Sequence, residues 1–274
     1  GPTVGGSVMP EGHTIHRAAR LQSVALGTGP ITVRSPQGRF SDGADLLDGK
    51  RIESIDAAGK HLFHCWEDGS VLHIHLGLFG KFRTHRKQPY PEPSPNARLT
   101  MIGDSAVYLS GPTVCEVLTP EEADDIRMRL GPDPLDAEAD PERFFASLDR
   151  RSIPISAALL DQAAIAGVGN VYRAELLFLS GIHPDRPAKD TTDAERADLW
   201  KRSVGLLAIG ERLGRIVTVD ADEVGSQPLR DIPAGERLYV YKRAGDPCRR
   251  CGTEIRSWDM RGRTVWACPT CQPR

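Results

Sequence analysis

Apolar residues recur with a helical period at the start of the chain and with a shorter, strand-like period after it. In residues 11–26, apolar side chains three or four positions apart share one face of a helix, which Gly27 ends. Residues 31–118 instead contain short stretches such as SVLHIHL and ARLTMI, separated by Gly, Pro, Asp and Ser. The pattern predicts a first domain, residues 9–119, built as a β-sandwich flanked by helices.

The pattern becomes helical again after Thr119. Gly131-Pro132, Gly181 and Gly214 act as boundaries, and we expect helices at residues 121–130, 141–149, 154–162, 169–180 and 192–213. The segment LYVYKR (238–243) has the character of a strand and leads into a cysteine-rich end. These elements predict an α+β protein of several domains, with a helical domain at 120–240 and a small third domain at 241–274.

Composition and length narrow the class of protein. The 274 residues can form two or three modest domains, each with its own core. No stretch approaches the ~20 apolar residues of a membrane span, and no leader of the signal-peptide type is present. We therefore expect a soluble cytoplasmic protein, a monomer, with no membrane partner.

Charge is distributed unevenly, although the net charge is only −2. Residues 120–145 carry nine acidic and three basic residues, whereas residues 237–274 carry nine basic and three acidic residues. Phosphates are contacted locally, so a basic end favours an anionic partner such as nucleic acid even when the mean charge is near zero. The arginines that suggest phosphate binding at this end are Arg249, Arg250, Arg256, Arg261 and Arg263.

Four of the six cysteines form two CxxC pairs, Cys248/Cys251 and Cys268/Cys271. Two such turns complete a tetrahedral shell of four thiolates, which leaves no open position for catalysis, so one structural Zn²⁺ is expected. Two disulfides would require an oxidising compartment. The residues between the pairs predict a zinc ribbon hairpin with its turn near Met260-Arg261-Gly262.

Pro10 and Glu11 stand side by side near the N-terminus. At a free N-terminus proline is a secondary amine with a pKa of about 8, which can attack an electrophilic carbon and form an iminium ion. A neighbouring glutamate could then move protons. Taken alone, the pair is more simply explained as the first turn of a helix.

Six motifs follow one another along the chain: MPEGHTIHRAARL, AGKHLF (58–63), HLGLFGKF (75–82), LGPDPL (130–135), DQAAIAGVGNVYRAELLF (161–178) and GRTVWACPTCQ (262–272). In this order they resemble the formamidopyrimidine-DNA glycosylase and endonuclease VIII family. The PEG opening is similar to the endonuclease VIII branch, and above all to actinobacterial proteins that begin PEGHT.

The resemblance implies a role for individual residues of the first domain. Pro10 would be the nucleophile that attacks C1′ of the damaged nucleotide, Glu11 the general acid, and Lys60 the lysine that holds a phosphate beside the lesion. Leu78 matches the wedge that fills the gap left by an extruded base, and Phe79 stands where endonuclease VIII has a tyrosine.

Two further residues would bind DNA from the rest of the chain. Asn170, in GVGN, matches the asparagine of the helix-two-turn-helix motif, where glycines let backbone amides approach a phosphate. Arg263 matches the ribbon arginine that grips the phosphates around the flipped nucleotide. Alone, each of these residues could be an ordinary turn or surface residue.

The implied activity is that of a bifunctional DNA glycosylase and abasic-site lyase in base excision repair, associated with the nucleoid. Its partner would be double-stranded DNA with oxidised bases or abasic sites, with oxidised pyrimidines favoured over 8-oxoguanine-type purines. A non-catalytic DNA-binding protein, or a zinc-ribbon accessory protein for RNA, are the rival interpretations.

Some positions depart from the family pattern. Thr14 replaces an acidic residue, and residues 215–235 have no clear match to the lesion-covering loop of the formamidopyrimidine branch. Residues 1–8 are interpreted as a tag remnant, although a different native start is an alternative. While they stay attached, the Pro10 nitrogen is an amide, so this chain should bind DNA without cutting it through Pro10. Four histidines, 61, 64, 73 and 75, are expected to line a polar sheet face rather than bind metal.

Overall fold

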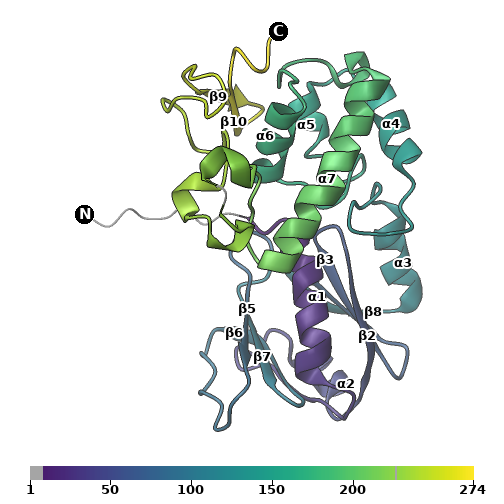
Figure 1. Cartoon of the computed structure of the whole chain (residues 1–274). Coiled ribbons are helices and arrows are strands. Elements are labelled where there is room, and N and C mark those ends of the chain that lie inside the picture. Colours follow the sequence, from purple (N-terminus) through teal and green to yellow (C-terminus); the bar gives the residue numbers. More distant parts are fainter. Residues whose placement is uncertain (1–8, 226) are drawn as a thin grey trace. The chain divides into compact units, whose positions relative to one another are not determined.

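The computed structural model describes residues 9–225 and 227–274, which divide into two compact units between Arg129 and Leu130 (Figure 1). The predicted tag remnant at residues 1–8 lies outside the described residues. Within the described ranges, none of the helices has the length and apolarity needed to span a membrane. The division into domains 9–119, 120–240 and 241–274 stays a prediction.

Two four-stranded antiparallel sheets form the first unit. One sheet has the order β2 (Ile52–Ala58), β3 (His61–Trp66), β4 (Val71–His75) and β8 (Val114–Leu118). The other has the order β1 (Thr32–Arg34), β6 (Ala97–Ile102), β7 (Ala106–Ser110) and β5 (Lys81–His85). The predicted β-sandwich is therefore confirmed, and β5 is an edge strand.

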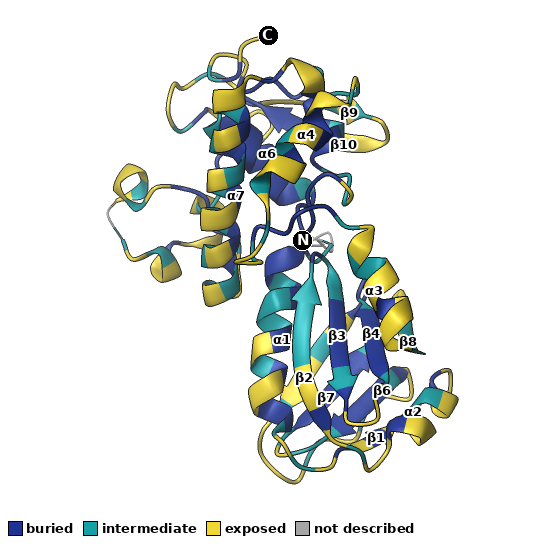
Figure 2. Cartoon of the chain, turned by 90° about the vertical axis from the view of Figure 1, so that its right-hand side faces the viewer, coloured by how far each residue is buried: buried dark blue, intermediate teal, exposed yellow. Residues whose placement is uncertain are grey.

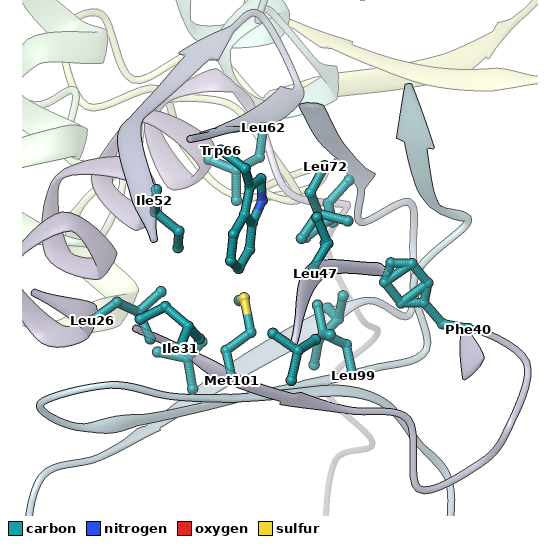
Figure 3. Packing of buried hydrophobic residues seen from close by; sticks show 14 of the residues in the cluster. Leu26, Ile31, Phe40, Leu47, Ile52, Leu62, Trp66, Leu72, Leu99 and Met101 are labelled. Atoms are coloured by element: carbon teal, nitrogen blue, oxygen red, sulfur yellow. The ribbon is translucent and has the colours of Figure 1, made fainter. Parts of the chain in front are cut away.

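The core of this unit lies between the two sheets. Trp66 of β3 and Met101 of β6 point toward each other, and both are buried (Figure 3). Helix α1 (Gly12–Leu26) adds Ile15 and Leu26 to the same cluster. Helix α2 (Ser41–Leu47), which the sequence pattern did not predict, adds Leu47. The sandwich is thus closed by helices and held by apolar burial.

Helix α3 (Pro120–Met128) belongs to the first unit although the sequence turns helical at its start. Thr119 and Glu122 form a capping box that fixes its first turn. The helix then packs Ala123 against Phe63 and Val71 on the outer face of the sheet, and Arg127 forms an ion pair of 2.7 Å with Asp56.

The second unit combines helices, short 3₁₀ turns and one hairpin. Its helices are α4 (Pro141–Asp149), α5 (Ile155–Ala158), α6 (Asn170–Leu179) and α7 (Asp193–Leu213). The 3₁₀ turns are η1 (Ala188–Asp190), η2 (Ala221–Val224), η3 (Leu229–Asp231) and η4 (Ala234–Glu236). The hairpin pairs β9 (Arg256–Met260) with β10 (Arg263–Ala267). Figure 2 shows α6 buried along its length, as the centre of this unit.

Two predicted elements are wrong. The helix expected at 154–162 covers only Ile155–Ala158, because the chain turns after it and Gln162 hydrogen-bonds the carbonyls of Leu160 and Val168. No strand forms at residues 238–243. The apolar pattern of that segment arises because Tyr239 and Val240 are both buried, while its backbone amides bind a carboxylate of α6.

That carboxylate belongs to Glu175, which is fully buried. Glu175 Oε2 accepts hydrogen bonds from the amides of Val240 at 2.8 Å and Tyr241 at 3.0 Å. Oε1 accepts from the amide of Tyr239 and the hydroxyl of Thr218. One charged side chain therefore fixes the segment that leads from α7 to the cysteines, and four donors offset the cost of burying it.

We expect Glu175→Gln to lower the free energy of unfolding of the second unit by about 3 kcal/mol, because an amide NH₂ would face backbone donors in a buried site. Thermal melting and hydrogen exchange at residues 238–241 measure the change. Glu138→Gln, at an exposed position of the same unit, is the matched control. Equal melting of the two variants would contradict this role.

Candidate active site and metal centre

Pro10 lies just before helix α1, and Glu11 is the N-cap residue that precedes its first turn. Glu11 is extended and only 2% exposed, and its carbonyl accepts a hydrogen bond of 3.0 Å from the amide of Thr14. Burial, followed by the charge of Arg17, lowers the pKa of His13 to about 4. The imidazole beside Glu11 is therefore neutral near pH 7.

Pro10 opens onto a pocket of about 450 Å³. Thr14 and Arg17 of α1 line one side of it, and Leu78 with the start of β5 lines the other. Two predicted site residues far apart in sequence, Pro10 and Leu78, thus meet in one hollow. Thr14, at the position that departs from the family pattern, faces the same space.

Leu78 and Phe79 occupy a tight turn between β4 and β5. The Gly80 amide donates to Leu76 O at 3.0 Å, and a Cβ on Gly80 would come within 2.3 Å of that oxygen. Only glycine closes the turn this tightly. Phe79 is 72% exposed and Leu78 is 38% exposed, so the turn presents two large apolar side chains at the surface.

Lys60 follows Gly59 in the turn between β2 and β3. A chain of hydrogen bonds runs beside it: His61 Nδ1 to His73 Nε2 at 2.8 Å, and His73 Nδ1 to Glu116 at 3.0 Å. Burial, and then the charges of neighbours that include Lys60, lower the pKa of His61 to about 3. These imidazoles hold one another in place next to the lysine.

The prediction of one polar histidine face is correct for three residues and wrong for the fourth. His61, His73 and His75 contact one another on one side of the sheet. His64 points to the other side, is fully buried and bonds Gln22 of α1 at 3.0 Å. His64 faces away from His61 because successive residues of a strand face opposite sides and these two are three positions apart.

The GVGN turn is braced from within the second unit. The side-chain oxygen of Gln162 accepts from the amide of Gly167 at 2.9 Å, and Gly167 has a φ of +95°. Gly169 is the last residue before α6, so Asn170 begins the helix. The positive end of the α6 dipole is therefore directed at the turn that carries Asn170.

Arg173 joins this turn to the hairpin. It is 1% exposed, and it donates to the side-chain oxygen of Asn170 and, at 3.0 Å, to the carbonyl of Thr264 on β10. Arg263, the residue before Thr264, is exposed. The two DNA-binding candidates of this unit are thus linked through one buried guanidinium.

The four cysteines converge at the base of the hairpin. Their sulfur atoms all lie within 4.8 Å of one another, with Cys251 and Cys268 3.3 Å apart and Cys248 and Cys271 4.0 Å apart. Zn–S bonds of ~2.3 Å in a tetrahedron require sulfur separations of roughly 3.8 Å. The donor set fits zinc, as the spacing predicted. The hairpin turn at Arg261-Gly262, both with positive φ, is also as predicted.

Arg249 and Arg250, two of the arginines that suggest phosphate binding, form hydrogen bonds within the second unit. Arg249 donates to the carbonyls of Gly235 and Leu238, both at 2.9 Å. Arg250 bonds the carboxylate of Glu223 at 3.1–3.2 Å and lies over the ring of Tyr239. The turn Cys248–Cys251 therefore holds residues 223, 235 and 238 in place through these two arginines.

Sequence reasoning missed Gln162, Arg173 and Glu175 as organisers of the second unit. All three lie inside the longest family-like motif. The available signal was the composition of α6, since a helix that is apolar on every side has no solvated face for Arg173 and Glu175, which must therefore be paired.

Comparison with known proteins shows the family to which the chain belongs. Residues 9–113 match the family model of the formamidopyrimidine-DNA glycosylase N-terminal domain, and residues 130–220 match that of its H2TH domain. The chain is 45% identical to endonuclease 8 1 of Mycobacterium tuberculosis, over 96% of this chain and all of that protein. The chain belongs to the formamidopyrimidine-DNA glycosylase and endonuclease VIII family. The predicted resemblance is confirmed.

Other members of the family agree along the whole length. The formamidopyrimidine-DNA glycosylase of Thermus thermophilus is 34% identical, over 96% of this chain and 97% of that protein. Among solved structures, the Lactococcus lactis glycosylase in complex with abasic-site DNA has a TM-score of 0.79 at 25% identity, covering 96% of this chain and all of that one. The fold of this glycosylase family is therefore present in full.

Proposed function

We propose that this protein is a bifunctional DNA glycosylase and abasic-site lyase whose nucleophile is the amine of Pro10 in a chain that begins there. The observation that carries the proposal is the pocket that joins Pro10 to Leu78, in a chain 45% identical to endonuclease 8 1. An extruded nucleotide would enter the pocket while the Leu78-Phe79 turn fills the gap.

The reaction follows from the chemistry of a secondary amine. The Pro10 nitrogen donates its lone pair to C1′, and the bond from C1′ to the base breaks with its electron pair leaving on the base, which takes up the proton that the amine loses. Opening of the sugar ring gives an iminium ion, and Glu11 supplies the proton that the ring oxygen takes up. Loss of the C2′ proton then expels the 3′ phosphate, and loss of the C4′ proton expels the 5′ phosphate. Water hydrolyses the remaining iminium ion, which releases the sugar fragment, regenerates Pro10 and leaves a one-nucleotide gap.

The remaining residues would bind the DNA backbone. Lys60 would hold a phosphate beside the lesion, oriented by the histidines next to it. Asn170 and Arg263 would hold phosphates from the second unit, and Arg173 would keep the two in register. Contacts with the DNA backbone lower the activation barrier when they hold C1′ close to the Pro10 nitrogen. Loss of one of these contacts is therefore expected to lower the rate of turnover as well as the affinity for DNA.

Cys248, Cys251, Cys268 and Cys271 would hold one structural Zn²⁺. When bound, the ion fixes the base of the hairpin and takes no part in the reaction, because four thiolates fill its coordination sphere. The hairpin in turn carries Arg263 at its tip.

Oxidised pyrimidines are the proposed lesion class, and 8-oxoguanine is the alternative. We expect the chain beginning at Pro10 to release thymine glycol from duplex DNA at least about tenfold faster than 8-oxoguanine, a difference of ~1.4 kcal/mol in barrier height. Single-turnover excision of both lesions in one sequence context measures this. Faster release of 8-oxoguanine would reverse the lesion class, and release of neither lesion with intact DNA binding would favour a non-catalytic binder.

A further inference from the structure

The Leu78-Phe79 turn separates two hollows of the first unit. Leu78 lines the pocket that contains Pro10. Phe79 lines a second groove of about 410 Å³ on the outer face of the sheet β1-β6-β7-β5. This groove contains neither Pro10 nor Glu11, so the proposed reaction leaves it without a role.

Basic side chains form one wall of the groove. Lys81, Arg83 and His85 alternate along the edge strand β5, so they share a face with spacings of about 6.8 Å. Glu92 is the one carboxylate among the lining residues of the groove. Two cations in one row, Lys81 and Arg83, with a histidine beyond them, favour an extended polyanion.

Aromatic rings form the floor and one end. Arg83 stands directly opposite Tyr108 of β7, and the ring of His85 lies 4.8 Å from that of Tyr108. The hydroxyl of Tyr108 donates to the carbonyl of Pro91 at 2.9 Å, which fixes the loop on the far side. Exposed Phe79 closes the end next to the turn. Cations beside an exposed aromatic ring are the combination that binds nucleotide strands.

We infer that this groove binds the DNA strand opposite the lesion. The inference rests on the proposed function, in which the damaged strand enters the Pro10 pocket. A wedge inserted into a duplex has the damaged strand on one side and its complement on the other. Since Leu78 lines the Pro10 pocket, the groove on the Phe79 side receives the complement, with phosphates along β5 and a base against the exposed ring of Phe79.

The test compares duplex and single-stranded DNA that carry the same uncleavable abasic analogue. Lys81 and Arg83 also line the Pro10 pocket, so the first variant is His85→Glu, which changes the groove alone. We expect it to weaken duplex binding about tenfold and to leave single-strand binding unchanged. Arg39→Glu, which places the same glutamate at an exposed position outside the groove, is the control and should change neither.

A second measurement identifies the strand. Neutral methylphosphonates placed one at a time in the complement should weaken wild-type binding at one or two positions and have no further effect on His85→Glu, as in a double-mutant cycle. The same coupling found in the damaged strand, or equal losses for duplex and single strand, would overturn the inference. Wild-type protein that binds no abasic duplex would instead refute the proposed function.

Discussion

A chain that begins at Pro10 is expected to form a covalent complex with abasic-site DNA when borohydride is present, whereas the chain that retains residues 1–9 is not. Borohydride reduces the iminium ion that only a free amine can form. In the longer chain the Pro10 nitrogen is an amide, and its lone pair is delocalised into the carbonyl. Loss of a nucleophile costs several orders of magnitude, so trapping should differ by at least about a thousandfold.

The two chains are matched controls for each other because they share every residue that lines the pocket. Both should shift abasic DNA in a gel to the same extent, which separates binding from chemistry. The trapping rate of the shorter chain should also rise as pH increases toward about 8, where the amine loses its proton. Equal trapping by both chains would contradict the role of Pro10. Loss of that trapping in Lys60→Ala would then identify the lysine as the amine.

Much of the fold could be predicted because its signals are local. Helix α7 carries its own start and stop in sequence, a capping box at Thr192 and Glu195 and a left-handed Gly214. The hairpin turn and the paired cysteines are likewise set by neighbouring residues. These features depend on interactions between residues that are a few positions apart, so they can be predicted from the sequence.

The parts that could not be predicted depend on partners far away in the chain. The sequence of LYVYKR (238–243) predicts a strand. Its backbone amides instead donate to the carboxylate of Glu175, 64 to 66 residues earlier. The charge of Arg250 suggests phosphate binding, and the pattern does not show that its side chain is paired with Glu223, 27 residues earlier. Pattern cannot show that a donor is already engaged. The same holds for the site: motifs name Pro10 and Leu78 separately, and only the fold brings them to one pocket.

The hydrogen bonds of Arg249 and Arg250 also support the cysteine cluster. Cys248 and Cys251 flank Arg249 and Arg250, whose hydrogen bonds reach back to Glu223, Gly235 and Leu238. Strand β10, which leads to Cys268, is tied to α6 through Arg173 and Thr264. A two-stranded hairpin is marginal without such support. The position of Arg263 therefore depends on the cysteine cluster, on the hydrogen bonds of Arg249 and Arg250, and on Arg173 together.

Removal of zinc, by a chelator or by Cys268→Ser, is expected to unfold the hairpin and to weaken binding of abasic DNA at least about a hundredfold. Metal binding in such sites contributes on the order of 10 kcal/mol to folding, and Cys268 is fully buried. Hydrogen exchange should increase in residues 221–237 as well as 243–272, since Arg249 and Arg250 lose their anchor. Metal analysis should give one zinc per native chain.

Cys65→Ser, at a half-buried thiol of the first unit, is the control variant and should retain both the metal and the affinity for DNA. Unchanged exchange in residues 221–237 after metal loss would show that the hydrogen bonds of Arg249 and Arg250 hold without the ion.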